Sequence, residues 1–497
     1  MPVETPAPRD GLQEARRRLI AELMRRGAIF DELGRRFQDA GHELALVGGT
    51  VRDILLGRPS PDLDFTTDAR PEQITALLRG WADAWWEVGA AFGTVGGRKA
   101  GGITEIGGRK GDAVIEVTTY RDEVYRHDSR KPEVTFGDSL EHDLVRRDFA
   151  VNAMAVMLPE MTFVDPHDGL GDIGRRVLRT PGRPEDSFND DPLRMLRAAR
   201  FSATLGFDVD PTVVSAITEM AGRISIVSAE RVRDELVKLI CAPQPRRGLT
   251  LLVDTGLADH ILPELPKLAL EIDEHHRHKD VYEHTLTVLE QAIDLEEPGA
   301  EPDFVLRFAA LMHDVGKPKT RRFEPDGGVS FHHHEVVGAK LTAARMRALR
   351  FPNDVTADVS RLVELHLRFH GYGTGTWTDS AVRRYVADAG PLLDRLHKLT
   401  RSDSTTRNRR KAMQLSAAYD DLEERIARLR EQEQLEAIRP DLDGNAIMAI
   451  LGVPPGPVIG RAWAHLKEVR LDQGPLPPEA AEAELRRWWA DQPESTP

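Results

Sequence analysis

The sequence contains a single cysteine, Cys241, among 497 residues. An internal disulfide is therefore excluded, and a reducing compartment is favoured. No run approaches the roughly 20 consecutive apolar residues of a membrane-spanning helix. The first residues, 1–10, carry prolines and acids instead of the apolar stretch of a secretory signal. We therefore expect a cytoplasmic protein that is not associated with a membrane.

Aromatic residues and excess positive charge are also scarce. Aromatics make up 6% of the chain, too few for base-stacking surfaces along its whole length, and the net charge of −14 argues against nonspecific coating of nucleic acid. Two local basic segments remain, residues 175–183 and 407–411, and each taken alone is typical of a solvated surface. The 40% hydrophobic content is sufficient for packed cores, and the length predicts roughly three domains of about 150 residues.

The first part of the chain, to about residue 175, mixes strand and helix patterns. A glycine-rich stretch over residues 93–111 is typical of hairpins with tight turns. The predicted helices cover residues 13–40 and 51–56, and the predicted strands cover residues 44–47, 62–65 and 114–119.

Strand patterns nearly vanish after residue 176. Helical periodicity covers residues 192–221 and 228–241, and the segment 261–266 has the composition of a linker. The last ninety or so residues, from about 411, are also predicted to be helical, with interruptions at prolines and glycines.

Gly48 and Gly49 follow the apolar run 44–47. A glycine pair lets backbone N–H groups approach a phosphate closely. Asp62 and Asp64 are two residues apart, so on a strand they point to the same face. Two carboxylates on one face suit Mg²⁺ together with nucleotide phosphates. Each feature alone is more often a plain turn or a solvated loop edge; their conjunction favours a phosphoryl-transfer site.

Further motifs follow in a fixed order. They are Arg146-Arg147-Asp148 with Asn152, then residues 165–173, 190–201 and 229–235. In this order the motifs resemble those of the CCA-adding tRNA nucleotidyltransferases and the related bacterial poly(A) polymerases, over about residues 35–260. The resemblance implies an α+β protein. A polymerase-β-like nucleotidyltransferase head of mixed sheet plus helices would be followed by all-helical neck, HD and tail domains.

In nucleotidyl transfer a 3′-hydroxyl attacks the α-phosphate of a nucleotide and pyrophosphate leaves, commonly with two metal ions. Asp62 and Asp64 fit as the metal ligands. We expect Glu116 to be the third catalytic carboxylate, because its neighbours Ile115 and Val117 would point to the opposite, apolar face. Asp112 is the second choice, and a plain strand-edge charge is the alternative for Glu116.

The resemblance also implies which residues bind the nucleotide. The predicted set is Gly48, Gly49, Arg52, Asp53, Arg147, Asp148, Asn152, Asp191, Arg194 and Arg197. For Asp148 the alternative role is to cap the helix that we expect to follow it.

Asp191 and Arg194 are three apart on a predicted helix and can share a face. An acceptor beside a planar donor matches the Watson–Crick edges of cytosine and adenine, and it mismatches those of uracil and guanine. One such bidentate contact is worth roughly 1–3 kcal/mol of discrimination. The alternative is structural, with Asp191 capping a helix that starts at Pro192.

A second group of candidate ligands lies in the histidine-rich middle of the chain. It consists of His284, the His313-Asp314 doublet and Asp403, with His334 and His366 as possible additional ligands. The doublet in its His-Asp-Val-Gly-Lys context resembles the HD metal-dependent phosphohydrolase superfamily. Imidazoles with carboxylates suit a transition metal (Mn, Ni, Co, Fe or Zn) better than Mg²⁺. His332 and His333 are expected to be loop residues.

These expectations combine into four domains: the head at 25–175, the neck at 176–262, the HD domain at 270–410 and a helical tail at 411–497. The resemblance implies a nucleotidyltransferase that adds C, C and A to tRNA 3′ ends from CTP and ATP. Two alternatives remain open: a poly(A) polymerase on the same scaffold, or a metal phosphohydrolase whose head only binds RNA. The oligomeric state and the contacts of the tail are left open.

Overall fold

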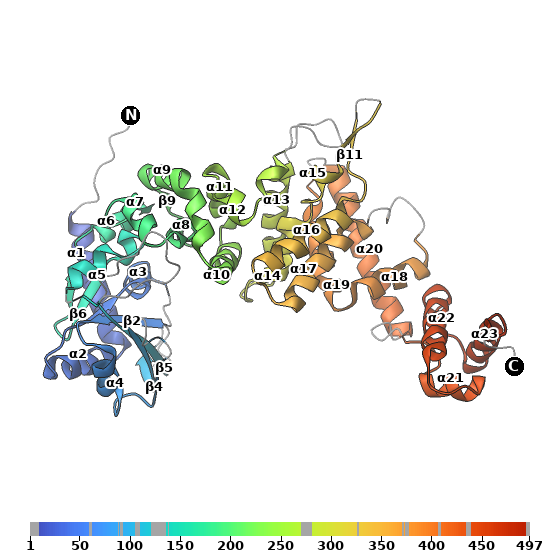
Figure 1. The fold of residues 1–497 in the computed structure, drawn as a ribbon, viewed down its shortest axis with the longest axis horizontal. Helices are drawn as coiled ribbons and strands as arrows, with labels where there is room; N and C mark the ends of the chain where they lie inside the picture. Colours follow the sequence, from blue (N-terminus) through green and yellow to red (C-terminus); the bar gives the residue numbers. More distant parts are fainter. Residues whose placement is uncertain are drawn as a thin grey trace. The chain divides into compact units, whose positions relative to one another are not determined.

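The computed structural model describes residues 9–58, 62–87, 89, 93–104, 110–120, 136, 137, 139–269, 281–325, 328–369, 372, 377–405, 409–433 and 439–493. The chain divides into two compact units, Met1–Pro263 and Glu264–Pro497. The mixed-sheet head and the helical remainder that the sequence predicts are both present (Figure 1).

A seven-stranded mixed sheet forms the head, in the order β3-β4-β5-β2-β1-β6-β7 (Figure 1). The central strand β2 runs parallel to β5 and antiparallel to β1. The strands are β1 (Leu44–Val47), β2 (Asp62–Thr67), β3 (Ala84–Trp86), β4 (Thr94–Thr104), β5 (Lys110–Thr119), β6 (Ala155–Leu158) and β7 (Thr162–Val164). The predicted strands 44–47, 62–65 and 114–119 are therefore confirmed, and β4 pairs with β5 as an antiparallel hairpin.

Helices pack on both faces of this sheet, since Leu144 shares a core with Ala45 and Val47 on the face away from Phe65. The head helices are α1 (Arg9–Arg26), α2 (Ile29–Asp39), α3 (Gly49–Leu55), α4 (Pro71–Leu78), α5 (Leu140–Val145) and α6 (Gly169–Arg175), with a 3-10 turn η2 (Ala150–Asn152). Phe30 and Phe37 of α2 share a buried core with Phe65, Ile115 and Val117 of the sheet. Because side chains alternate along a strand, this core directs the intervening Asp64 and Glu116 to the other face.

The single helix predicted over 13–40 is wrong in one respect: it is two helices. Gly27 separates α1 from α2 with φ of 138°, a conformation that favours glycine.

The neck in the same unit is helical. It contains α7 (Pro184–Asp190), α8 (Leu193–Leu205), α9 (Pro211–Met220), the 3-10 turn η3 (Ala221–Ile226), α10 (Ala229–Ile240), α11 (Pro245–Asp254) and α12 (Ala258–Ile261), with a short ladder of β8 (Val177–Leu178) and β9 (Asp208–Val209). The predicted helix 192–221 is interrupted at Gly206 (φ 71°), which ends α8 in a left-handed conformation. Asp210 then caps α9 by accepting from the Thr212 N–H.

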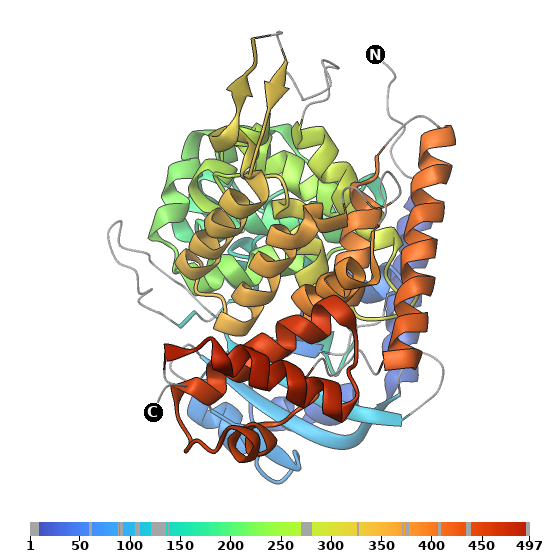
Figure 2. The ribbon, with the colours of Figure 1, turned by 90° about the vertical axis from the view of Figure 1, so that its right-hand side faces the viewer.

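The second unit is also helical apart from one hairpin, β10 (Arg322–Phe323) and β11 (Val329–Ser330) (Figure 2). Its helices are η4 (Pro266–Leu268), α13 (Val281–Asp294), α14 (Phe304–Met312), α15 (Lys317–Thr320), α16 (His334–Ala348), α17 (Asn353–Leu365), η5 (His366–Phe369), α18 (Asp379–Ala389), η6 (Gly390–Leu392), α19 (Leu393–Asp403), α20 (Arg409–Glu433), α21 (Gly444–Leu451), α22 (Pro457–Gln473) and α23 (Pro478–Ala490). The last three helices enclose a small core of their own. Among the described residues, no helix is long and apolar enough to cross a membrane.

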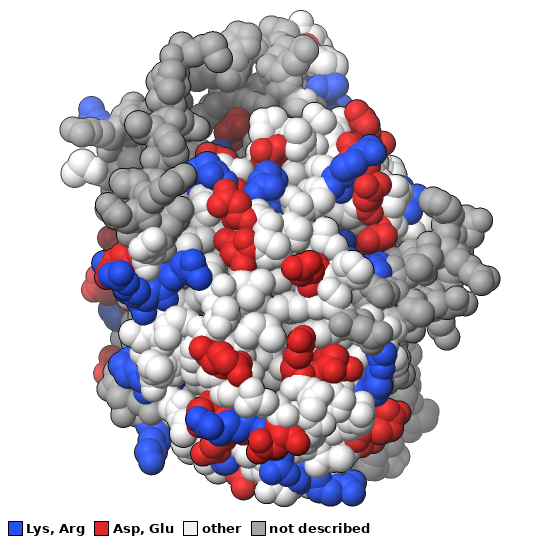
Figure 3. Space-filling model, turned by 90° about the vertical axis from the view of Figure 1, so that its left-hand side faces the viewer, with Lys and Arg blue, Asp and Glu red and all other residues white. Residues whose placement is uncertain are grey.

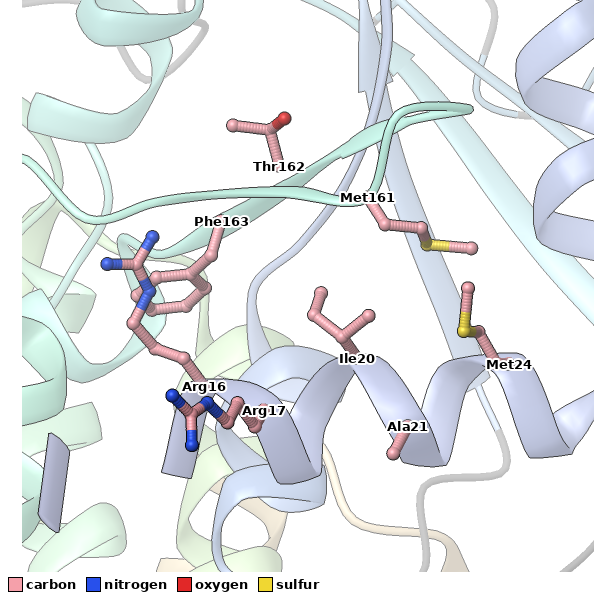
Figure 4. Close-up of a pocket in the computed structure, with 8 residues that line it drawn as sticks. All are labelled: Arg16, Arg17, Ile20, Ala21, Met24, Met161, Thr162 and Phe163. Carbon is pink, nitrogen blue, oxygen red and sulfur yellow. The ribbon is translucent and has the colours of Figure 1, made fainter. Parts of the chain in front are cut away.

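One hollow on the head, of about 520 Å³, lies between α1 and the β6–β7 turn (Figure 4). Its lining residues are Arg16, Arg17, Ile20, Ala21, Met24, Met161, Thr162 and Phe163. None of the residues predicted to bind a nucleotide is among them, so this hollow is not the predicted site.

Candidate functional site

Gly48 brings the glycine turn against a carboxylate and a guanidinium. Its φ of 72° and ψ of −138° form a conformation that side chains rarely adopt. A Cβ atom at Gly48 would lie 3.1 Å from Arg147 Nη1 and 3.8 Å from Asp64 Oδ2. The predicted glycine turn, metal-binding carboxylate and phosphate-binding arginine therefore meet at one point.

The carboxylates of the sheet lie side by side. Asp64 and Glu116 are direct partners in the parallel ladder of β2 and β5, so their side chains point to the same face. Glu116 is exposed and Asp64 is half-buried. Asp62 opens β2 opposite Val114, and its side chain lies outside the described residues.

Asp112, the second choice for the third carboxylate, is held elsewhere. It accepts a hydrogen bond from Arg98 Nε at 2.9 Å, which lowers the pKa of the exposed Asp112 carboxyl. This ion pair favours Glu116 for the catalytic role and leaves Asp112 a structural one.

A chain of charged hydrogen bonds runs from the glycine turn into the neck. Arg52 donates to both carboxylate oxygens of Asp53 and, through Nη1, to Asn152 Oδ1 at 2.6 Å. Asn152 Nδ2 donates to Asp148 Oδ1 at 2.9 Å. Arg197 of α8 donates to Asp148 Oδ2 through Nε at 2.8 Å and through Nη2 at 2.6 Å. Five of the predicted nucleotide-binding residues thus form one connected network.

Two residues that the sequence reasoning assigned no such role complete the network. Glu235 of α10 accepts from Arg197 at 3.4 Å and from Arg200 at 2.5 Å, and its side chain is 5% exposed. Residues 229–235 belong to one of the ordered motifs of the sequence, but nothing in their spacing indicates contact with the arginines of α8.

The ring of Phe201 lies at the centre of these charges. The guanidinium carbons of Arg52, Arg197 and Arg200 lie 5.1, 5.4 and 3.8 Å from its centroid, within the range of cation–π attraction. Phe149 packs edge-on against it with centroids 5.7 Å apart. Phe201 therefore positions two of the predicted nucleotide-binding arginines.

Asp148 is ionised despite its burial. Burial opposes the charge, but Arg197 and the hydrogen bond from Asn152 outweigh it and hold the pKa of Asp148 well below its usual range. Asp148 does not cap an α-helix: it is followed by the 3-10 turn η2, and its Oδ1 accepts from the Phe149 N–H. The expectation of a helix start at this position is therefore wrong.

Asp191 and Arg194 do not share a helix. Asp191 ends α7 in an extended conformation, two residues before α8 begins, so the predicted helical pairing is wrong. The Leu193 N–H and Arg231 Nη2 donate to the two oxygens of Asp191 at 3.1 and 2.7 Å. Arg194 donates to the carbonyls of Ser187 and Arg146. Both side chains are therefore fixed in orientation, each by its own partners.

The basic segment 175–183 is largely neutralised. Arg175 and Arg179 pair with the buried Asp172 at 2.6 and 3.0 Å. On the face of unit Met1–Pro263 seen in Figure 3, Lys and Arg side chains alternate with Asp and Glu over the described surface. In the other basic segment, residues 407 and 408 lie outside the described residues.

The second unit gathers all six predicted HD-type ligands. His284 Nε2 lies 3.0 Å from Asp403 Oδ1, and His313 Nε2 lies 3.5 Å from the same atom. Asp314 turns Oδ2 toward His313 at 3.2 Å and Oδ1 toward His334 at 3.3 Å. Two ligand groups result, His284–His313–Asp403 and Asp314–His334–His366, with the atoms of each group within 4.8 Å of one another.

The ring orientations suit metal binding. His313, His334 and His366 direct Nδ1 to the carbonyl three residues earlier, at 2.7–2.8 Å. This contact fixes the tautomer and leaves Nε2 as the ligand atom. These three Nε2 atoms are buried, and those of His313 and His334 face the carboxylate of Asp314 at 3.2 and 3.3 Å. Burial lowers the pKa of His366 to about 3, so its imidazole is neutral, as a ligand must be.

Family models match three successive parts of the chain. They are described as "Poly A polymerase head domain" over residues 44–179, "Probable RNA and SrmB-binding site of polymerase A" over 206–268 and "HD domain" over 281–428. An A-adding tRNA nucleotidyltransferase from Deinococcus radiodurans is 36% identical over 460 residues, or 91% of this chain and 96% of the relative. The chain belongs to the tRNA nucleotidyltransferase family.

Two further relatives bear on the activity of the enzyme. A CC-adding tRNA nucleotidyltransferase from Thermus thermophilus is 32% identical over 89% of this chain and 93% of that protein. The crystal structure of the Bacillus stearothermophilus CCA-adding enzyme in complex with CTP matches with a TM-score of 0.62 and 25% identity, covering 92% of this chain and 95% of that chain. The enzyme is thus a nucleotidyltransferase, and its relatives differ in which nucleotides they are named for adding.

Replacement of Gly48 by alanine should disable the enzyme. The new Cβ would meet Arg147 at a backbone conformation reserved for glycine. We expect nucleotide incorporation, measured with tRNA and labelled CTP or ATP, to fall at least about tenfold, which corresponds to roughly 1.4 kcal/mol in the transition state.

The matched control is Gly57→Ala at the other end of α3. Gly57 also has a positive φ, 67°, but a Cβ there meets nothing within 4 Å among the described residues. It should lose about 1 kcal/mol of stability and keep its activity. Equal activity losses in both variants would contradict a special role for the Gly48 turn.

Replacement of Phe201 by leucine should weaken nucleotide binding more than stability alone explains. Phe207→Leu is the control, because Phe207 is equally buried and faces one guanidinium at 5.8 Å. Both variants should unfold more easily, by roughly 1–3 kcal/mol. Only Phe201→Leu should raise KM for the nucleotides, by about threefold to tenfold in steady-state kinetics. A KM unchanged in Phe201→Leu would reduce the ring to a core residue.

Proposed function

We propose that the enzyme adds C, C and A to the 3′ end of tRNA, using CTP and ATP and releasing pyrophosphate, in the cytoplasm. The observation that carries the proposal is the meeting of Asp64, Arg147 and the Gly48 turn, with Glu116 beside Asp64 on the same face of the sheet. A site of this kind presents carboxylates and a phosphate-binding turn to one nucleotide.

Asp62 and Asp64 would hold Mg²⁺, whose charge supports transfer by stabilising the phosphates of the nucleotide. The side chains of the enzyme supply the remaining parts. Arg147, next to the glycine turn, would bind the triphosphate, and Glu116 would accept the proton of the attacking 3′-hydroxyl or complete the metal shell. The Asp148–Arg197 pair would fix the surface against which the nucleotide binds.

Asp191 and Arg194 would select the base. Their contacts leave capacity for this role, because a carboxylate accepts up to about four hydrogen bonds and Arg194 also carries an Nε–H donor. Arg231 orients Asp191, and Ser187 orients Arg194. An acceptor and a donor held apart by separate partners can match the amino group and ring nitrogen of C or A.

The second candidate is addition of only part of the CCA end. Both full-length relatives described above are named for a partial reaction, A-adding in one and CC-adding in the other. Three tRNA substrates decide between the reactions: one lacking CCA, one ending in C and one ending in CC. Full addition extends all three to CCA, an A-adding enzyme extends only the third, and a CC-adding enzyme stops before A. Extension of tRNA by a run of A from ATP alone would identify a poly(A) polymerase.

Asp64→Asn should abolish incorporation of both CMP and AMP. Loss of a metal-binding carboxylate removes several kcal/mol of transition-state stabilisation, so we expect more than a hundredfold loss in single-turnover assays. Asp112 lies on the same face of β5 as Glu116 but pairs with Arg98. Asp112→Asn should therefore retain most of the activity. Comparable losses of activity in the two variants would contradict the assignment of Asp64 as a metal ligand.

We further propose that the HD cluster binds two transition-metal ions and hydrolyses phosphate esters. The two ligand groups meet at Asp314, whose two oxygens face opposite groups and could bridge the ions. The carboxylate set is already ionised: although burial opposes the charge, His313 and Lys317 hold the pKa of Asp314 well below its usual range. Such metals supply Lewis acidity toward a phosphate ester.

His366→Ala should lower the bound transition metal from about two ions to about one per chain, as loss of one of two metal positions requires. Mass-spectrometric metal analysis measures this change directly, and tRNA extension should be unaffected. His333→Ala is the control, since this ring is 84% exposed in the loop beside the cluster. A wild-type chain that binds none of Mn, Ni, Co, Fe or Zn and hydrolyses no phosphate ester would contradict the proposal.

A further inference from the structure

A hairpin rises directly from the HD cluster. The segment between two proposed ligands, Asp314 and His334, contains α15 and the strands β10 and β11, and the hairpin projects beyond the helices of its unit (Figures 1 and 2). Both ends of the segment are bound to the cluster. Lys317 Nζ lies 2.8 Å from Asp314 Oδ2, and the Phe331 carbonyl accepts from His334 Nδ1 at 2.8 Å.

The two ends of the hairpin segment contact each other at its base. Lys317 Nζ lies 5.6 Å from the centroid of the Phe331 ring, so the two ends of the segment also contact each other. Phe323 of β10 pairs with Val329 of β11, two residues before Phe331. Phe323 therefore lies about 7 Å along the hairpin from the level of Phe331, whose carbonyl orients the proposed ligand His334.

Phe323 presents its ring to solvent. The residue is 70% exposed, whereas its strand partner Val329 is 5% exposed and supplies the apolar packing of the hairpin. The guanidinium carbon of Arg321 lies 5.3 Å from the Phe323 centroid. Single exposed apolar residues are common on proteins, but this one combines an open ring, a nearby cation and a place on a hairpin whose two ends contact the HD cluster.

The same segment is basic in an acidic protein. Lys317, Lys319, Arg321 and Arg322 lie within six residues, and the whole chain carries a net charge of −14. Lys319, Arg321 and Arg322 are exposed. Cations interleaved with an exposed aromatic ring are the surface chemistry that binds single-stranded nucleic acid, through phosphate attraction and base stacking.

We propose that the β10–β11 hairpin is a binding surface for the single-stranded end of an RNA. A base stacks on Phe323, and the flanking phosphates contact Arg321 and Arg322. This binding does not depend on the proposed HD function.

The test is local labelling of the full chain by a short RNA. The probe is an RNA hexamer with a 3′-phosphate and a diazirine on its last base, because carbene insertion does not depend on the residue it meets. Labelling is done in EDTA, where no metal-dependent hydrolysis occurs, and labelled peptides are mapped by mass spectrometry. We expect label in residues 317–334.

Two variants separate stacking from charge. Phe323→Ser should reduce the hairpin label about tenfold at subsaturating RNA, with unchanged salt dependence. Arg321→Ala/Arg322→Ala should flatten the slope of log K against log salt by about 1.4, for two phosphate contacts on a single strand. Met413→Ser is the control, because Met413 is 74% exposed on α20 of the same unit. All these variants should retain tRNA extension.

The outcomes are distinct. Labelling confined to other peptides, or a hairpin label that Phe323→Ser leaves unchanged, overturns the proposal and points to a protein partner for the exposed ring. Hairpin labelling that responds to both variants supports it. If such a protein, loaded with Mn, Ni or Co, then fails to release phosphate from the hexamer, the HD function is wrong and the RNA-binding hairpin stands.

Discussion

The ion pair between the buried Asp148 and the half-buried Arg197 is the interaction on which the proposed nucleotide site depends. Asp148 belongs to the head and Arg197 to the first long helix of the neck, so one pair fixes two structural layers at the place where a nucleotide would lie. Asp148 is 7% exposed. A buried pair of this kind offers little net stability, but loss of one partner costs about 3–5 kcal/mol because the other charge is left uncompensated. The pair therefore specifies geometry more than it adds stability.

The network keeps its charges balanced as it extends. Asp53, Asp148 and Glu235 alternate with Arg52, Arg197 and Arg200, so each of these carboxylates contacts a guanidinium. Phe201 offsets part of the repulsion among these cations, since the face of its ring attracts three guanidinium groups. A triphosphate that arrives at the glycine turn thus meets arginines whose orientation is already fixed, which reduces the entropy lost on binding.

The HD cluster combines imidazole and carboxylate ligands from several helices. Its imidazoles come from α13, from the end of α14, from the start of α16 and from η5, and Asp403 comes from the end of α19. Each fixed ring is oriented by a carbonyl of its own chain segment, so helix ends rather than long-range pairs set the ligand directions. The two centres share no residue and lie in different compact units, which agrees with one chain carrying two separable chemistries.

The sequence by itself determined what is local. The Gly48-Gly49 turn, the alternation around Glu116 and the strand 44–47 follow from glycine's freedom and from the two-residue period of a strand, and the structure has all three. Tertiary structure decided what depends on segments far apart in the chain. It separated Asp191 from the helix of Arg194, since Asp191 takes an extended conformation at the end of α7. There Arg231 of α10 donates a hydrogen bond to the Asp191 carboxylate. It joined Glu235 and Phe201 to the arginines, and it brought His334 and His366 to Asp314. No spacing rule predicts such contacts, because they arise from how helices pack rather than from how one helix or strand repeats.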